Sequence, residues 1–170
     1  MSHRHLDNVR TDLKVAIIVC SDRASKGEYD DKVIPTARGI LREIGWELIF
    51  ETIVPDDIDA IKDAIEEAIN SGVDVVFTSG GTGVSPRDVT PEASAQFFHR
   101  EVPGIAELMR LKSLEKTPHA ALSRAKSGIT RDGVFIVNLP GSPKAVKELV
   151  PILKPVLIHG VNIARGRKIE

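Results

Sequence analysis

The run Lys14–Cys20 constrains the fold more than any other segment, because every position after the first is apolar and most are β-branched. Such a strand needs cover on both faces, which is typical of a parallel sheet held between layers of helices. Two further segments, Trp46–Val54 and Val73–Phe77, also have the pattern of strands. The chain therefore favours a sheet built from strands that are separated by helices.

Helical patterns alternate with these strands. Apolar residues recur on one face of Ile58–Ile69, and either Asp56 or Asp57 caps the start of that helix. The other predicted helices span about 32–44, 91–100, 103–115, 143–153 and 155–165. Segments 125–130 and 134–138 flank the turn 131–133, which predicts a hairpin. We expect an α/β fold: a three-layer sandwich with a mostly parallel central sheet, helices on both faces and a small antiparallel element.

The composition limits the organisation and the partners. A chain of 170 residues has the length of one domain, which we place at 13–170 after a polar N-terminal leader at 1–12. With 4% aromatic residues and a net charge of −1, the chain lacks the stacking rings and the basic surface of a nucleic-acid binder. It has no apolar run of membrane-spanning length and no signal-peptide pattern, so we expect no membrane association and a cytoplasmic location.

A glycine-rich loop, Thr78–Gly83, directly follows the strand at 73–77. Open α/β sheets bind ligands where strands end, and glycines let backbone amides approach an anion. The loop lacks the Gly-Lys-Ser/Thr of a P-loop, so a structural turn and a phosphate site are both compatible with it. The next segment, 86–93, adds a cation and two carboxylates, with Thr90 expected as a helix N-cap and Pro91 as the first helical residue. This addition favours the phosphate site.

A second loop, Asn138–Lys144, has the same arrangement of strand end, glycine and helix start. Lys144 adds a positive charge, whereas Ser142 alone is explained as an ordinary N-cap. In a parallel sheet this loop emerges beside the glycine loop and beside Ser21–Arg23. We therefore expect three loops to converge on one crevice.

Four segments carry a resemblance to a known family. Segment 78–93 resembles the hallmark of the molybdopterin-binding family, in particular its Mog/MoaB group of molybdenum cofactor biosynthesis proteins. Segments 101–104 and 138–144 are also similar to that family, as are 21–25 and the following Gly27, Tyr29 and Asp31. The matches keep the order and spacing of the family from about residue 14 onward, and the adenylyltransferase branch is the most similar.

The resemblance implies transfer of an adenylyl group from Mg-ATP to molybdopterin with release of pyrophosphate. It makes Asp56 and Asp88 catalytic and places Mg²⁺ on both carboxylates, where the ion offsets the negative charges of the two phosphates that meet. The alternatives are a helix cap for Asp56 and a turn-forming residue for Asp88. The substrate-binding residues that it implies are Ser21, Asp22, Thr78, Ser79, Gly80, Gly81, Thr82, Gly83, Pro91, Glu92, Asn138, Pro140, Gly141, Ser142, Pro143 and Lys144.

The family likeness also implies partners. It predicts self-association as a homotrimer or hexamer, and hand-over of the product to a molybdenum-insertion protein. Asp31 matches a family position in the loop after the first strand, where the chain departs from the family near Val33. Glu101 and Arg124 also match family segments, and each is equally compatible with a helix boundary or a subunit contact. A non-catalytic molybdopterin carrier of the same fold is the main alternative. A relative that inserts the metal is longer and has several domains.

Overall fold

Six strands form one sheet in the order β2-β1-β3-β6-β5-β4. The computed structural model describes residues 9–167. Strands β1, β2, β3 and β6 run parallel, and β5 runs antiparallel to both β6 and β4. The sheet is therefore mostly parallel with an antiparallel element, as predicted. The strands are β1 (Lys14–Cys20), β2 (Glu47–Val54), β3 (Val75–Ser79), β4 (Arg100–Glu101), β5 (Ser127–Ile129) and β6 (Phe135–Leu139).

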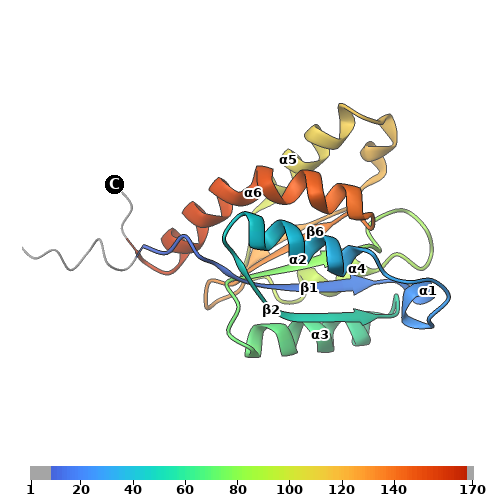
Figure 1. Cartoon of the computed structure of the whole chain (residues 1–170), viewed down its shortest axis with the longest axis horizontal. Coiled ribbons are helices and arrows are strands. Elements are labelled where there is room, and N and C mark those ends of the chain that lie inside the picture. Colours follow the sequence, from blue (N-terminus) through green and yellow to red (C-terminus); the bar gives the residue numbers. More distant parts are fainter. Residues whose placement is uncertain (1–8, 168–170) are drawn as a thin grey trace, which may run out of the picture.

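Helices cover both faces of this sheet (Figure 1). One face packs against α2 (Val33–Glu43), α5 (Pro103–Leu114) and α6 (Pro143–Ala164), and the other against α3 (Ile58–Asn70) and α4 (Thr90–Ala95). Alternate residues of β1 enter the two cores: Val15 and Ile17 lie in the first, and Ala16 and Ile18 in the second. The three-layer sandwich is therefore confirmed.

Helix α6 corrects one prediction. Two helices were expected with a break near Pro155, but α6 continues for 22 residues through Pro151 and Pro155. Both prolines are exposed, so the carbonyls that they leave unbonded can reach water. The opposite side of the helix buries Leu149, Leu153 and Leu157 against the sheet, and this burial offsets the lost hydrogen bonds.

Helix α4 corrects a second prediction. It ends at Ala95 instead of Arg100, and the chain that follows becomes β4 because the backbone of His99 donates to Ile129 O (2.8 Å). The expected N-cap is also displaced by one residue. Val89 is the N-cap and makes no side-chain capping bond, while Thr90 is the first helical residue. Two short elements complete the fold: α1 (Asp22–Ser25) and the 3-10 helix η2 (Pro118–Leu122).

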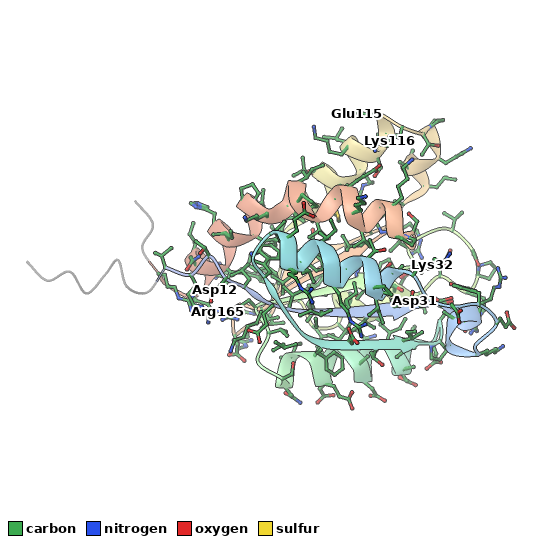
Figure 2. All side chains as sticks on the ribbon, in the orientation of Figure 1. Asp12, Asp31, Lys32, Glu115, Lys116 and Arg165 are labelled. Atoms are coloured by element: carbon green, nitrogen blue, oxygen red, sulfur yellow. The ribbon has the colours of Figure 1, made fainter. Side chains whose placement is uncertain are left out.

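The parallel strands all finish at the same end of the molecule. Figure 2 shows Asp12 and Arg165 at one end and Asp31 and Lys32 at the other, where the parallel strands finish. Of the predicted leader, residues 1–8 lie outside the described residues, and Arg10 is held to α6 by two hydrogen bonds with the amide of Asn162 (2.7 and 2.8 Å). Within 9–167, no helix is both long and apolar enough to cross a membrane.

Candidate active site

Three loops meet where β1, β3 and β6 end. Gly80 N donates to Leu139 O (3.1 Å), and Ser79 Oγ donates to Pro140 O (3.0 Å). A Cβ on Gly141 would lie 3.1 Å from Gly80 Cα, and one on Gly80 would lie 2.5 Å from Cys20 O. Only glycines allow these backbones to pack this closely, so the expected convergence of the loops is built on backbone contact.

The next two glycines also face the interior. Gly81 has φ +68°, and a Cβ there would lie 2.3 Å from Thr90 Oγ1 and 3.0 Å from Asp56 Oδ1. A Cβ on Gly83 would lie 3.0 Å from Asp88 Oδ2. Sequence reasoning attributed these glycines to close approach of a ligand. The structure gives a different physical reason: they let the loop lie directly against the carboxylates and Thr90.

Several predicted binding residues lie behind the loop. Asn138 is fully buried and donates both amide hydrogens, to Thr78 Oγ1 and to Ser94 Oγ (2.9 Å each). Its Oδ1 accepts from Lys126 N (3.0 Å). Thr78 and Ser79 are likewise buried. These side chains bond to other protein groups, so their hydrogen bonds join β3, β6 and α4 beneath the site.

The structure resolves the choice between Asp56 and Asp57. Asp57 is the N-cap of α3, because its Oδ2 accepts from Ala60 N (2.9 Å). Asp56 instead exchanges hydrogen bonds with Asp22: Asp22 N donates to Asp56 Oδ2, and Asp56 N donates to Asp22 Oδ1 (3.0 Å each). Asp56 is therefore free of the capping role and joins the loops after β1 and β2.

Other charged side chains lie near Asp22 and Asp56. Arg87 donates to both carboxylate oxygens of Asp22 (2.9 and 3.1 Å), and these bonds hold the pKa of Asp22 below its ordinary value. Burial raises the pKa of Asp56, and the negative charges of Asp22 and Asp88 add to the rise. Asp88 accepts from Ser85 N (2.9 Å), a local bond typical of a turn. Asp56 and Asp88 therefore belong to one acidic centre.

Arg124 holds the glycine loop in shape. Its backbone N donates to Thr82 O (2.8 Å), its Nε to Gly83 O (2.6 Å) and its Nη2 to Asp88 O (2.8 Å). It also pairs with Glu92, an exposed residue of α4. The only sequence signal for Arg124 was its match to a family segment, because its partners lie 32 or more positions away.

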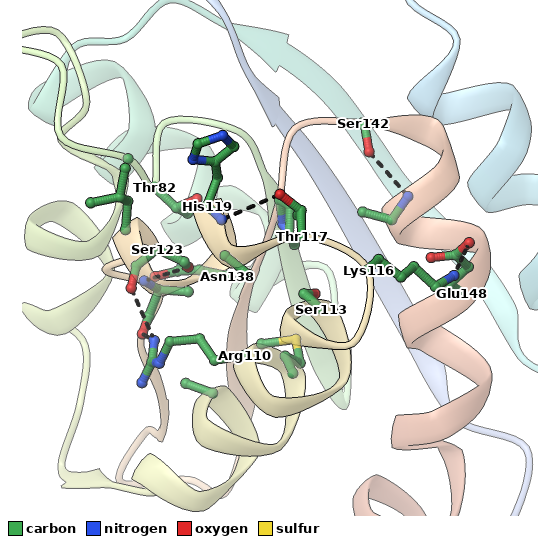
Figure 3. Close-up of a pocket in the computed structure, with 18 of the residues that line it drawn as sticks. Thr82, Arg110, Ser113, Lys116, Thr117, His119, Ser123, Asn138, Ser142 and Glu148 are labelled. Atoms are coloured by element: carbon green, nitrogen blue, oxygen red, sulfur yellow. Dashed lines mark hydrogen bonds and ion pairs between the residues drawn. The ribbon is translucent and has the colours of Figure 1, made fainter.

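Two cavities flank the loops in place of the single crevice that was expected. The first, of about 440 Å³, lies between the glycine loop, α5, η2 and the start of α6 (Figure 3). The second, of about 600 Å³, lies beside the end of β1. Predicted residues in the first are Thr82, Gly83, Asn138, Pro140, Ser142 and Lys144. Those in the second are Ser21, Ser79, Gly80, Gly141 and Pro143.

Successive residues of the loop 140–144 therefore face alternate cavities. Ser142 is also the N-cap of α6, where its Oγ accepts from Ala145 N (3.1 Å). This confirms the expectation that Ser142 is an ordinary N-cap. Pro143 is the first helical residue of α6, and Pro91 is buried in the first turn of α4. Lys144 is exposed at the start of α6.

Sequence reasoning missed the side chains that α5, η2 and the turn between them bring to the first cavity. Arg110, Lys116 and His119 line it, and Figure 3 shows Lys116 paired with Glu148 of α6 across the space. In the second cavity, Tyr29 OH is 3.0 Å from Ser21 Oγ. Only the folded chain reveals the α5 and η2 residues, whereas Tyr29 was already part of a recognised motif.

The remaining undecided residues lie near segment boundaries. Asp31 lines the second cavity, and its carboxylate accepts from Val33 N (3.0 Å) and Ile34 N (2.8 Å) at the start of α2. Glu101 is exposed on β4, the edge strand next to β5. The structure thus gives Asp31 a helix-capping contact and places Glu101 on the sheet edge.

The donor set fits a magnesium ion. Asp56 and Asp88 bring two carboxylates against the glycine loop, and the charge of Asp88 acts on that of Asp56. Within residues 9–167, no group of three or more His, Cys, Asp or Glu side chains is placed to hold a metal ion. Magnesium is commonly bound by one or two carboxylates together with substrate phosphates, and this arrangement provides for that.

Comparisons with known proteins agree with this geometry. The sequence model of a family described as "Probable molybdopterin binding domain" matches residues 16–159. A molybdopterin adenylyltransferase of Haemophilus influenzae is 40% identical over 156 residues, which cover 88% of this chain and 79% of the relative. One of Pyrococcus furiosus is also 40% identical over 156 residues, 89% of this chain and 91% of the relative.

Solved structures agree as well. The crystal structure of the molybdopterin biosynthesis enzyme MoaB from Thermus thermophilus superposes with a TM-score of 0.82 at 41% identity. The superposition covers 93% of this chain and 99% of that one. The mixed sheet and its flanking helices are therefore similar to those of a solved MoaB protein.

Proposed function

The chain belongs to the molybdopterin-binding family, and we propose that it is a molybdopterin adenylyltransferase of molybdenum cofactor biosynthesis. In this reaction the phosphate of molybdopterin attacks the α-phosphorus of ATP, a new phosphoanhydride bond forms, and the bond to the leaving pyrophosphate breaks. The observation that carries the proposal is the acidic centre of Asp56 and Asp88 against the glycine loop. The carrier alternative offers no role for such a centre.

The two cavities suit a reaction between two substrates. The loop 140–144 contributes to both, because Pro140, Ser142 and Lys144 line the first cavity and Gly141 and Pro143 line the second. A pterin phosphate and a nucleotide bound in the two cavities would bring their phosphates together at this loop. Such positioning supplies much of the rate enhancement in phosphoryl transfer.

Cations are arranged to hold the anionic substrates. Lys144 lies in the first turn of α6, where backbone amides and the helix dipole also favour negative charge. Arg110, Lys116 and His119 line the same cavity. Lys144 and Arg110 neutralise part of the substrate charge before the two phosphates meet, whereas Lys116 is already paired with Glu148.

Asp56 and Asp88 would hold Mg²⁺, which would draw charge from the α-phosphate toward the leaving pyrophosphate. Asp22 fixes one oxygen of Asp56 through its backbone N–H, and Arg87 neutralises the side chain of Asp22. This arrangement restrains one oxygen of the Asp56 carboxylate while the substrates react.

The transfer needs no protein nucleophile. The candidate thiol, Cys20, is buried behind the glycine loop, and burial raises its pKa to about 12. It therefore stays protonated at neutral pH, and the thiol is a poor nucleophile in that form. Direct attack of the pterin phosphate on ATP is consistent with this environment.

We extend the proposal to assembly and location. Leu111 and Leu114 of α5 and Leu122 of η2 are exposed, by 63%, 41% and 54%. Three exposed leucines on neighbouring elements suit a subunit interface, so we propose a homotrimer or a hexamer of two trimers. We place the reaction in the cytoplasm and the next step, metal insertion, on a separate protein.

The decisive experiment is incubation of the chain with molybdopterin, ATP and Mg²⁺, followed by measurement of pyrophosphate and adenylyl-molybdopterin in equal amounts. Omission of molybdopterin and addition of EDTA are the controls. We expect product only in the complete mixture. Molybdopterin binding without pyrophosphate release would overturn the proposal and identify a carrier.

A further inference from the structure

Two oxygens behind Gly81 have no hydrogen-bond partner although both are buried: Thr90 Oγ1 and Asp56 Oδ1. Thr90 is completely buried as the first residue of α4. Both atoms lie against one point, the position of a Cβ on Gly81, at 2.3 and 3.0 Å. Native proteins rarely leave two buried polar atoms unpaired at the same place, so their proximity needs an explanation.

The two groups are chemically complementary. A hydroxyl donates one hydrogen bond, and an ionised carboxylate only accepts. The Cys20 thiol also lies against Thr90, but a thiol sulfur is a weak acceptor, so the carboxylate is the better partner. The two oxygens make no hydrogen bond to each other in the structure. We propose that Thr90 is a positioning residue whose side chain turns so that its hydroxyl donates to Asp56 Oδ1 and fixes the direction of that carboxylate during the reaction. The proposal rests on the proposed adenylyl transfer, in which Asp56 acts directly.

Thr90 would complete a support for Asp56 that the structure already shows in part. Asp22 N donates to Asp56 Oδ2, so a donor on Oδ1 stops the carboxylate from rotating. A carboxylate has about four lone-pair directions, which leaves two for the reacting centre. Thr90 N also donates to Gly81 O (3.1 Å), so this residue sets the position of the loop and of the carboxylate together.

The absence of a side chain at Gly81 leaves the space between the two oxygens open. Any Cβ there would lie within contact of both and would separate the hydroxyl from the carboxylate. Gly81 and Thr90 therefore act together to position the Asp56 carboxylate. Thr90 then has a role that neither helix capping nor substrate contact explains.

The test compares Thr90→Val, which keeps the shape and removes the hydroxyl, with Thr90→Ser, which keeps the hydroxyl. We expect Thr90→Val to lower kcat for pyrophosphate release about tenfold with both KM values within twofold, because a misdirected carboxylate affects the transition state most. Thr90→Ser should restore kcat to within threefold of the wild type. Thr130→Val is the matched control, since it removes a bonded hydroxyl from the distant β5–β6 turn. An unchanged kcat in Thr90→Val would overturn the proposal.

A double-mutant cycle tests whether Thr90 acts through Asp56. In an Asp56→Ala background, Thr90→Val should cause no further loss of kcat, and the losses of Tm should also be less than additive. Additive losses in both measurements would overturn the proposal. The Tm cycle does not depend on turnover. If the wild-type chain released no pyrophosphate, the proposed function would fail, and the Tm cycle would still decide whether the two side chains interact.

Discussion

Substitution of Gly81 by alanine tests the interior role of the glycine loop. Gly81 has φ +68°, and its Cβ would meet the Thr90 hydroxyl at 2.3 Å and the Asp56 carboxylate at 3.0 Å. Gly166 provides a matched control, because its φ of +71° is nearly the same and nothing lies within 4 Å of its Cβ. The two variants share the backbone strain of about 1–2 kcal/mol and differ only in the collision.

Overpacking of this kind typically costs about 1–3 kcal/mol. We therefore expect Gly81→Ala to melt about 2–12 °C below Gly166→Ala, since 1 kcal/mol shifts the Tm of a domain of this size by about 2–4 °C. Turnover should also fall in Gly81→Ala, at least tenfold, because Thr90 and Asp56 are pushed apart. Differential scanning calorimetry and pyrophosphate release on the same preparations measure both effects. Equal melting temperatures together with normal turnover would refute the interior role.

Three other predictions concern the carboxylates, pH and assembly. Asp88→Ala should keep the fold and lower pyrophosphate release about a hundredfold. Asp57→Ala is the control, because it removes only the α3 cap, lowers stability by about 1 kcal/mol and leaves turnover per folded molecule intact. Near-normal release by the Asp88 variant would contradict a catalytic role for Asp88. Arg87 lowers the pKa of Asp22, so this pair stabilises the fold above the unfolded-state pKa of about 3.9 and loses that contribution as pH falls through the lower folded value. The Tm difference between Arg87→Met and wild type should therefore be large at about pH 6 and small below about pH 3, and a pH-independent difference would count against the pair. Leu111→Glu should convert trimers to monomers in light scattering, and a monomeric wild type at micromolar concentration excludes the trimer.

The parts of the fold that could be predicted from the sequence are those that depend on residues close together in the chain. The apolar run of β1 and the apolar stripe of α3 each depend on residues that are neighbours in sequence, so the three layers followed from them. The N-cap of α6 at Ser142 is equally local. Helix α6 was divided wrongly because proline was judged by its local effect, whereas its exposure on one helix face is set by packing against the sheet.

The candidate site shows the same division. Glycines after a strand marked the sheet edge, and the family motif marked Asp56 and Asp88. The sequence could not decide whether Asp56 or Asp57 caps α3, because both stand at the right distance from the helix. The fold decides, since the backbone N–H of Asp22 comes within 3.0 Å of Asp56 only when the loops after β1 and β2 lie side by side.

The sequence by itself therefore determined the layers, the strand ends and the residues that are proposed for a phosphate site. Tertiary structure alone decided that the glycines face Thr90 and the carboxylates, that Asn138 is enclosed, and that Arg124 holds the loop. It also gave two cavities in place of the expected crevice, with successive residues of the loop 140–144 lining one or the other. The physical reason is that periodicity and capping depend on residues within a few positions, whereas burial and hydrogen-bond partners depend on segments 30 to 65 positions apart in the chain.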